Sequence, residues 1–134
     1  MSAQTILVVD DDPDQHRLCA LLLEHAGYRV LHANDGVEGV ALARAEQPDL
    51  VMMDIRMARM DGVSARRELA ADPATQGIPV VAVTADLMQW PPARLLDEGF
   101  VAYLAKPCDL RRLLRVVQGV LAGTPDAPGA PVPA

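Results

Sequence analysis

Five short apolar runs, each followed by a longer amphipathic stretch, constrain the fold of this chain more than any other feature. The runs have the length of strands, and they are TILVVD (5–10), YRVLHA (28–33), DLVMMD (49–54), PVVAVT (79–84) and VAYLAK (101–106). The first, third and fourth runs are apolar on both strand faces. This pattern is typical of parallel strands that helices cover on each side of a sheet.

The stretches between these runs have the spacing and the end signals of helices. We expect helices over residues 13–26, 37–46, 63–72 and 91–98, and a last helix from the N-cap Asp109 to about Leu121. The first helix is expected to carry one apolar stripe, formed by Leu18, Leu21, Leu22 and Ala26. The expected buried side of the last helix consists of Leu110, Leu113, Leu114, Val117 and Leu121.

Five strand–helix repeats predict an α/β fold, a flavodoxin-like, doubly wound (βα)5 domain with a five-stranded parallel sheet. The expected strand order is 2-1-3-4-5, which places a functional site at the carboxyl ends of strands 1 and 3. The domain is expected to cover residues 1–122. Segment 123–134 is rich in proline, and we expect either a disordered tail or the stub of a linker to a further domain.

Charge and composition exclude several classes of partner. The net charge is −6 and the basic residues are scattered, which argues against direct nucleic-acid binding. No apolar run approaches the roughly 20 residues that cross a bilayer, and the first residues carry no cleavable signal. Cys19 and Cys108 lie far apart without metal-type spacing, so we expect reduced thiols in a cytoplasmic protein.

Three carboxylates are predicted to meet at one edge of the sheet. Asp10 and Asp11 end strand 1, and Asp54 ends strand 3. About 4 Å apart at an effective dielectric constant near 20, each pair of like charges costs on the order of 4 kcal/mol. A bound cation offsets this repulsion, and oxygen ligands favour a hard ion such as Mg²⁺. Asp12, ahead of Pro13, has the simpler interpretation of a helix cap.

Two further strand ends complete the predicted site. Strand 4 ends at Thr84 and strand 5 at Lys106, so a hydroxyl and an ammonium group face the three carboxylates. With a divalent cation, this set favours phosphoryl transfer, which depends on positioning and charge neutralisation. The nucleophile is expected to be Asp54, which stands alone at its strand end and forms an aspartyl phosphate.

The segments ILVVDDD, MMDIRMARMDG, VVAVTAD and YLAKP carry a resemblance to a known family. From about Thr5 to Leu121 the chain resembles the receiver domains of bacterial two-component response regulators. The resemblance implies that Asp54 is the phosphoacceptor. It implies that Mg²⁺, or Mn²⁺ in its place, is held by Asp10, Asp11, Asp54 and the backbone carbonyl of Arg56.

The same resemblance assigns the remaining roles. Thr84 is the expected switch hydroxyl, and Tyr103 matches the aromatic switch position that reports the state of Thr84. Lys106 is expected to bind a phosphoryl oxygen, and the peptide bond before Pro107 is expected to be cis. The partners implied are a histidine kinase or a histidine phosphotransfer protein. A downstream protein is expected to bind the face of helix 4, strand 5 and helix 5.

The sequence departs from the family pattern near the site. The loop after Asp54 reads Met57–Ala58 where Met–Pro is frequent, so it lacks a fixed φ angle. Arg56 and Asp86 have opposite charges; they either pair across the site and shield the acyl phosphate or remain solvated separately. Trp90, with Met88 and Tyr103, either forms part of a partner-binding face or is a single surface apolar residue.

Three classes of function follow from these residues. The favoured one is a receiver that catalyses only its own phosphorylation and dephosphorylation and signals through a conformational switch. An alternative is a receiver-like interaction module that works without phosphorylation, although the complete set of site residues argues against it. A metal-dependent phosphatase or phosphotransferase that acts on small molecules through an aspartyl phosphate is disfavoured, because that chemistry usually needs a second acid where this chain has Arg56.

Overall fold

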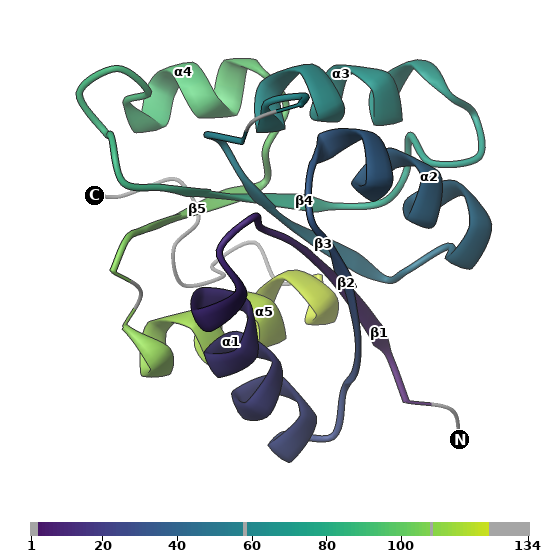
Figure 1. The fold of residues 1–134 in the computed structure, drawn as a ribbon, viewed down its shortest axis with the longest axis vertical. Coiled ribbons are helices and arrows are strands. Elements are labelled where there is room, and N and C mark those ends of the chain that lie inside the picture. The colour runs from purple at the N-terminus through teal and green to yellow at the C-terminus, as the bar shows by residue number, and fades with distance from the viewer. Residues whose placement is uncertain (1–2, 58, 108, 124–134) are drawn as a thin grey trace.

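Five parallel strands form one sheet with helices on both faces (Figure 1). The computed structural model describes residues 3–57, 59–107 and 109–123. The strands are β1 (Thr5–Val9), β2 (Arg29–Ala33), β3 (Leu50–Asp54), β4 (Val80–Thr84) and β5 (Ala102–Ala105). The helices are α1 (Pro13–His25), α2 (Gly36–Glu46), α3 (Gly62–Ala71), α4 (Pro92–Asp97) and α5 (Leu110–Ala122). The strand order β2-β1-β3-β4-β5 confirms the predicted topology.

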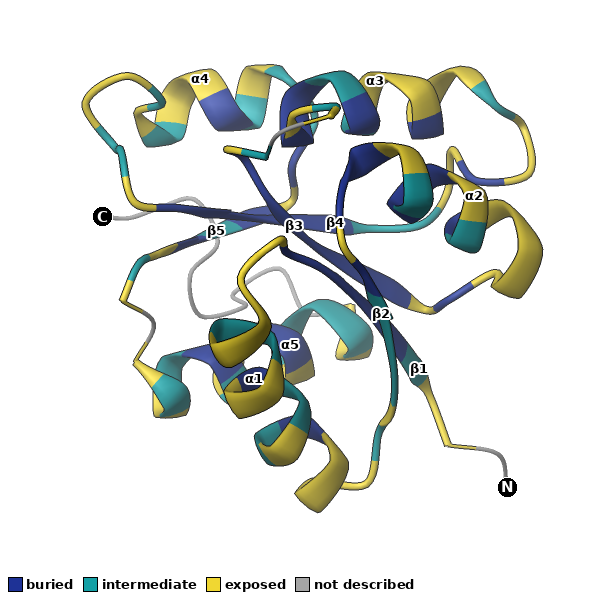
Figure 2. Ribbon diagram, in the orientation of Figure 1, coloured by how far each residue is buried: buried dark blue, intermediate teal, exposed yellow. Residues whose placement is uncertain are grey.

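The alternation of side chains along the strands divides the core into two layers. Ile6 and Val8 point toward α1 and α5, where they pack with Leu23 and other buried side chains. Leu7 and Val9 point to the opposite face, which α2, α3 and α4 cover (Figure 1). All five residues of β3 and of β4 are buried, as Figure 2 shows. Each such Val or Leu stabilises the fold by roughly 1.5–3 kcal/mol, so strands apolar on both faces specify a covered sheet.

Aspartates cap four of the five helices. Asp12 confirms the interpretation as a helix cap, because its Oδ1 accepts a hydrogen bond from the amide of Asp14 at 3.0 Å. Asp35, Asp61 and Asp109 cap α2, α3 and α5 in the same way, the last of them as predicted. A cap of this kind is typically worth about 1 kcal/mol, so these residues fix where each helix begins.

The predicted apolar stripe of the first helix was right only for Leu22, which is partly buried and packs against the core. Leu18 and Leu21 are 50% and 59% exposed, and the buried side chains of α1 are Cys19 and Leu23. The inward face is therefore turned by one residue, because α1 packs on the sheet beside α5 through Cys19 and Leu23. The apolar content of the helix did not reveal this rotation.

The last helix follows its prediction more closely. Leu113 and Val117 are fully buried, as expected, and so is Val116, which the prediction left out. Leu110, Leu114 and Leu121 are partly buried at the edges of the same face.

The remaining expectations concern the C-terminal tail, the two cysteines and membrane-spanning segments. Residues 124–134 and Cys108 lie outside the described residues, so the predicted tail and the state of that thiol stay predictions. Cys19 is a free, buried cysteine. Within the described residues, every helix is too short or too polar to span a membrane.

Candidate functional site

The pairing of β1 with β3 brings together aspartates that are far apart in sequence. Val9 pairs with Met53, so the residues that follow, Asp10 and Asp54, lie side by side at the carboxyl edge of the sheet. Asp10, Asp11 and Asp54 each place a carboxylate oxygen within 4.8 Å of the other two. Asp10 and Asp54 are buried, whereas Asp11 is exposed. The predicted convergence of the three carboxylates is thus present in the structure.

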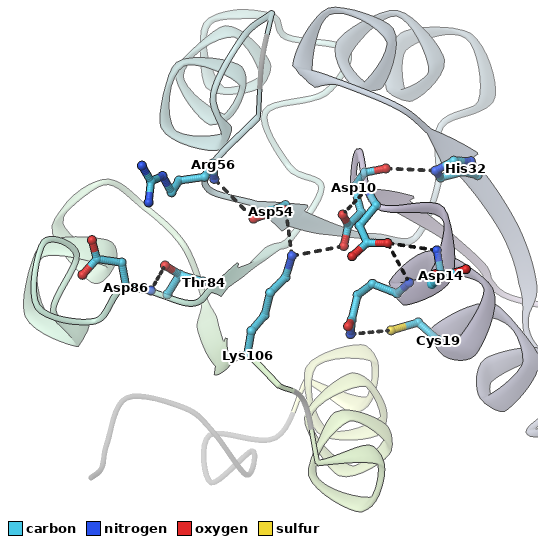
Figure 3. Close-up of polar contacts among 11 residues, drawn as sticks. Asp10, Asp14, Cys19, His32, Asp54, Arg56, Thr84, Asp86 and Lys106 are labelled. Carbon is cyan, nitrogen blue, oxygen red and sulfur yellow. Dashed lines mark hydrogen bonds and ion pairs between the residues drawn. The ribbon is translucent and has the colours of Figure 1, made fainter.

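Lys106 enters this cluster from the end of β5. Its Nζ donates to Asp54 Oδ2 at 2.8 Å and lies 3.4 Å from Asp10 Oδ2 (Figure 3). The backbone amide of Lys106 donates to the carbonyl of Thr84 at 2.8 Å, which holds the end of β5 against β4. The following Lys106–Pro107 peptide bond is cis, as expected. One ammonium group therefore bridges carboxylates from two strands.

Burial and charge act in opposite directions on this pair. Burial raises the pKa of Asp54, and Asp10 adds to that rise, while the hydrogen bond from Lys106 opposes it. Burial of Lys106 acts to lower its pKa, but pairing with Asp54 and Asp10 outweighs this effect, and the net direction is upward. The ammonium group is firmly protonated, whereas the carboxylate is less acidic than in water.

The donor set suits a hard divalent cation. It consists of carboxylate oxygens, two buried and one exposed, which is the ligand type that Mg²⁺ prefers while it keeps several waters. The turn after β3 wraps around Asp54, because the amide of Arg56 donates to Asp54 Oδ1 at 3.2 Å. This hydrogen bond fixes the backbone of Arg56 beside the cluster.

Thr84 and Tyr103 lie on the neighbouring strands. Thr84 is 1% exposed, and its Oγ1 accepts a hydrogen bond from the amide of Asp86 at 3.0 Å (Figure 3). Tyr103 is partly buried and packs against the core layer beneath α2, α3 and α4. The guanidinium carbon of Arg112 lies 5.9 Å from the centroid of the Tyr103 ring. The hydroxyl of Thr84 is thus held by its own loop.

The proposed pairing of Arg56 with Asp86 is absent. Among the described side chains no ion pair joins them, and Figure 3 draws them on separate loops. Asp86 instead accepts a hydrogen bond from the amide of Gln89 at 3.0 Å. The alternative of two separate side chains therefore holds.

Three supporting contacts escaped the sequence prediction. The Nε2 atom of His32 lies 3.1 Å from the backbone oxygen of Asp10, and the ring of His16 stacks on His32 with centroids 3.5 Å apart. Arg59 forms an ion pair with the nearly buried carboxylate of Asp35 at 3.3 Å, which ties the β3–α3 loop to α2. His32 lies on the strand expected to neighbour strand 1, so its contact with Asp10 could have been predicted from the sequence. The ion pair of Arg59 with Asp35 could not, because it depends on the conformation of a loop side chain.

The fold and the site define a class of protein, a doubly wound α/β signalling domain with an acidic cluster and a lysine at the carboxyl edge of its sheet. The chain belongs to the response regulator receiver domain family, whose model matches residues 6–118. Members of this family are signalling modules of two-component systems rather than classical enzymes, and Mg²⁺ and phosphorylation are typical of them.

Individual relatives agree with this assignment. The chain is 44% identical over 119 residues to the protein PilH of Pseudomonas aeruginosa, covering 88% of this chain and 98% of PilH. It is 31% identical to the polar-differentiation response regulator DivK of Brucella anthropi, covering 88% and 96% of the two chains.

A solved structure is similar as well. It is the receiver domain of the sensor histidine kinase PA1611 from Pseudomonas aeruginosa, with a magnesium ion coordinated in its active site cleft. The TM-score is 0.83 at 34% identity, over 90% of this chain and 99% of that one.

Proposed function

We propose that this domain accepts a phosphoryl group on Asp54 from the phosphohistidine of a histidine kinase or of a histidine phosphotransfer protein. The observation that carries the proposal is the contact of Lys106 Nζ with both Asp54 and Asp10, at 2.8 and 3.4 Å. A partly buried ammonium group beside paired carboxylates provides a charge that an incoming phosphoryl oxygen can use.

Each residue of the cluster has a role in this proposal. Asp10, Asp11, Asp54 and the carbonyl of Arg56 would hold Mg²⁺, or Mn²⁺ in its place, which would neutralise charge on the carboxylates and the phosphoryl oxygens. The magnesium ion in the similar PA1611 receiver domain supports this choice. Asp54 attacks phosphorus, and Lys106 moves its hydrogen bond from Asp54 to a phosphoryl oxygen.

Thr84 and Tyr103 would transmit the effect of phosphorylation from Asp54 to the surface of the domain. The hydroxyl of Thr84 accepts from the amide of Asp86 and can donate its own proton to a phosphoryl oxygen. Its movement would shift the loop before α4 and the packing of Tyr103. The face of α4, β5 and α5 then changes its affinity for a downstream protein, in a two-state equilibrium biased by the phosphoryl group.

The extent and the location of the protein belong to the same proposal. The signalling domain would comprise residues 1–122, with residues 123–134 as a tail or linker, and the exchange with the kinase would take place in the cytoplasm.

Intact mass after incubation with acetyl phosphate and Mg²⁺ tests the proposal. We expect wild type to gain one phosphoryl group, and the gain to vanish in Asp54→Ala and on addition of a chelator. Asp97→Ala is the matched control, since Asp97 is an exposed aspartate on α4 and should leave the gain intact. A folded wild type that gains no phosphoryl group would favour an interaction module that works without phosphorylation.

A further inference from the structure

The carbonyl of Asp10 lies where the parallel pairing of β1 with β2 ends. The amide of Asp10 still donates to the carbonyl of Ala33, at 3.0 Å. β2 ends at Ala33, and among the described residues no backbone amide donates to the carbonyl of Asp10. The Nε2 atom of His32 lies 3.1 Å from that carbonyl oxygen (Figure 3). A side chain of β2 thus replaces the backbone partner that the next residue of a longer strand would provide.

This hydrogen bond determines the tautomer of His32. A carbonyl oxygen can only accept, so the Nε2 atom of His32 carries a proton and donates it. The strand register explains why the side chain can reach this oxygen. His32 pairs with Val8, whose side chain lies on the sheet face that α1 and α5 cover, and Asp10 lies two residues beyond Val8. The ring of His32 therefore extends along the neighbouring strand, between the sheet and α1.

His16 of α1 holds the ring of His32 in this place. The two ring centroids are 3.5 Å apart and the ring planes are inclined by 20°, which is a stacked arrangement. The Nδ1 atom of His16 is buried and, within the described residues, has no hydrogen-bond partner. Burial lowers the pKa of His16, and His32 lowers it further, so the two rings stack without charge repulsion at pH 7 and above. His16 thus supports His32 through the face of its ring.

The peptide group that His32 contacts joins two of the predicted metal ligands. Asp10 and Asp11 are consecutive, and carboxylate oxygens of both lie within 4.8 Å of each other and of Asp54. The carboxylate of Asp10 is fixed in addition by the amide of Asp12, which donates to its Oδ1 at 2.8 Å. Asp11 is exposed, so the position of its carboxylate depends on the backbone that carries it.

We propose that His32 is a positioning residue for the metal site, an inference that rests on the proposed binding of Mg²⁺ by Asp10 and Asp11. Its Nε2–H group fixes the peptide between these aspartates, and the stack on His16 keeps the ring oriented for this bond. The two carboxylates are thereby held together before a cation arrives, so less conformational freedom is lost on binding. His32 acts through the backbone, and neither histidine is assigned as a ligand.

The Mg²⁺ affinity of two His32 variants tests the inference. Binding is measured by isothermal titration calorimetry at pH 8, where histidine side chains are ordinarily neutral. His32→Leu retains an apolar side chain but lacks the donor, and we expect the dissociation constant for Mg²⁺ to rise about fivefold, as the loss of one hydrogen bond predicts. His32→Gln carries an amide N–H group at a similar distance from the backbone and should restore most of the affinity.

Variants of His16 separate the stack from the hydrogen bond. His16→Phe keeps a flat ring and removes an Nδ1 atom that has no partner, so it should bind Mg²⁺ as wild type does. His16→Ala removes the ring, and we expect the dissociation constant to rise about threefold. His25→Leu is the matched control, because His25 is an exposed histidine in the last turn of the same helix. Its affinity should equal that of wild type.

Two further measurements distinguish positioning from a role in folding alone. Urea denaturation without metal gives the free energy of unfolding of each variant, which a purely structural role would lower without any change in Mg²⁺ affinity. The rate of phosphorylation by acetyl phosphate is measured by intact mass at two Mg²⁺ concentrations. His32→Leu should be slower than wild type at low Mg²⁺ and should approach the wild-type rate when Mg²⁺ is saturating.

The outcomes separate this inference from the proposed function. An unchanged Mg²⁺ dissociation constant in His32→Leu overturns the inference, and so does a His32→Gln variant that binds as weakly as His32→Leu. If His32→Leu does not fold, equal dissociation constants for His16→Ala and His16→Phe overturn it. Wild type that binds no Mg²⁺ overturns the inference and the proposed metal site together. Wild type that binds Mg²⁺ but gains no phosphoryl group, with the expected shifts in the variants, overturns the proposed function and supports the inference.

Discussion

At the scale of single residues, Asp54 is placed where its charge destabilises the fold. It is 5% exposed and lies against Asp10, and the hydrogen bond from Lys106 offsets the burial and the repulsion only in part, since its pKa remains raised. A structural site rarely retains such an arrangement, because an unbalanced buried charge is costly. In a functional site, the same excess of negative charge favours the binding of a cation, and perturbed pKa values of this kind are typical of such sites.

Asp54→Asn should therefore raise the free energy of unfolding at neutral pH without metal, because the replacement removes a charge that burial disfavours. The raised pKa means that the native state binds the Asp54 proton more tightly than the unfolded state does. The contribution of Asp54 is thus most favourable below its unfolded value of 3.8 and is lost as pH rises through the native pKa. Denaturation by urea from pH 3.5 to 7 should show the gap between variant and wild type widening over that window. A gap that narrows as pH rises would contradict the assignment.

At the scale of the elements, the contact between α3 and β3 determines where Asp54 sits. Gly62 begins α3, and its amide donates to the carbonyl of Ile55 at 2.9 Å. A Cβ atom at this position would lie 2.9 Å from the Cα of Ile55 and still closer to the carbonyl oxygen of Asp54. The helix can approach the strand end closely because this residue has no side chain.

Gly62→Ala should consequently cost about 2 kcal/mol of stability, because helix and strand end must move apart. It should also weaken Mg²⁺ binding, since the displaced backbone belongs to Asp54 itself. Thermal unfolding and a Mg²⁺ titration measure the two effects. Gly77→Ala is the matched control, because a Cβ there meets no atom within 4 Å. Equal stability and equal Mg²⁺ affinity in the two variants would show that the contact does not position the carboxylate.

The strands and helices show which structural features could be predicted from the sequence. Apolar runs and cap residues predicted all five strands and all five helices within one or two residues of their ends, because both depend on short-range spacing. The rotation of α1 was not predictable, since Leu18 and Cys19 are both apolar and the choice depends on the packing against the sheet and α5.

The candidate site also has features that the sequence predicted and features that it did not. Asp10, Asp54 and Lys106 were predicted to meet because the topology alone brings parallel strand ends to one edge. Whether Arg56 pairs with Asp86 could not be decided from the sequence, because exposed side chains on loops follow local hydrogen bonds such as that from Gln89 to Asp86.

At the scale of the whole molecule, stability should be linked to metal. A cation that binds the native cluster stabilises the entire fold, by about 2.7 kcal/mol when its concentration is 100 times the dissociation constant. We expect the midpoint of thermal unfolding to rise with Mg²⁺ and to return to its starting value with EDTA.

Asp11→Asn provides the control for this linkage. Asp11 is exposed, so its replacement should change the metal-free stability by no more than about 0.5 kcal/mol. The same change removes one of the three carboxylates and should strongly reduce the rise with Mg²⁺. A variant that responds to Mg²⁺ as wild type does would place the cation elsewhere.

Lys106 gives the resting domain a property that matters for reversibility. Its ammonium group already has two negative partners at 2.8 and 3.4 Å, so an arriving phosphoryl oxygen replaces a partner and does not add one. In the proposed reaction the number of charged contacts to Lys106 therefore stays nearly constant. Lys106 would thus exchange one anionic partner for another at the same strand end, both when the phosphoryl group arrives and when it leaves.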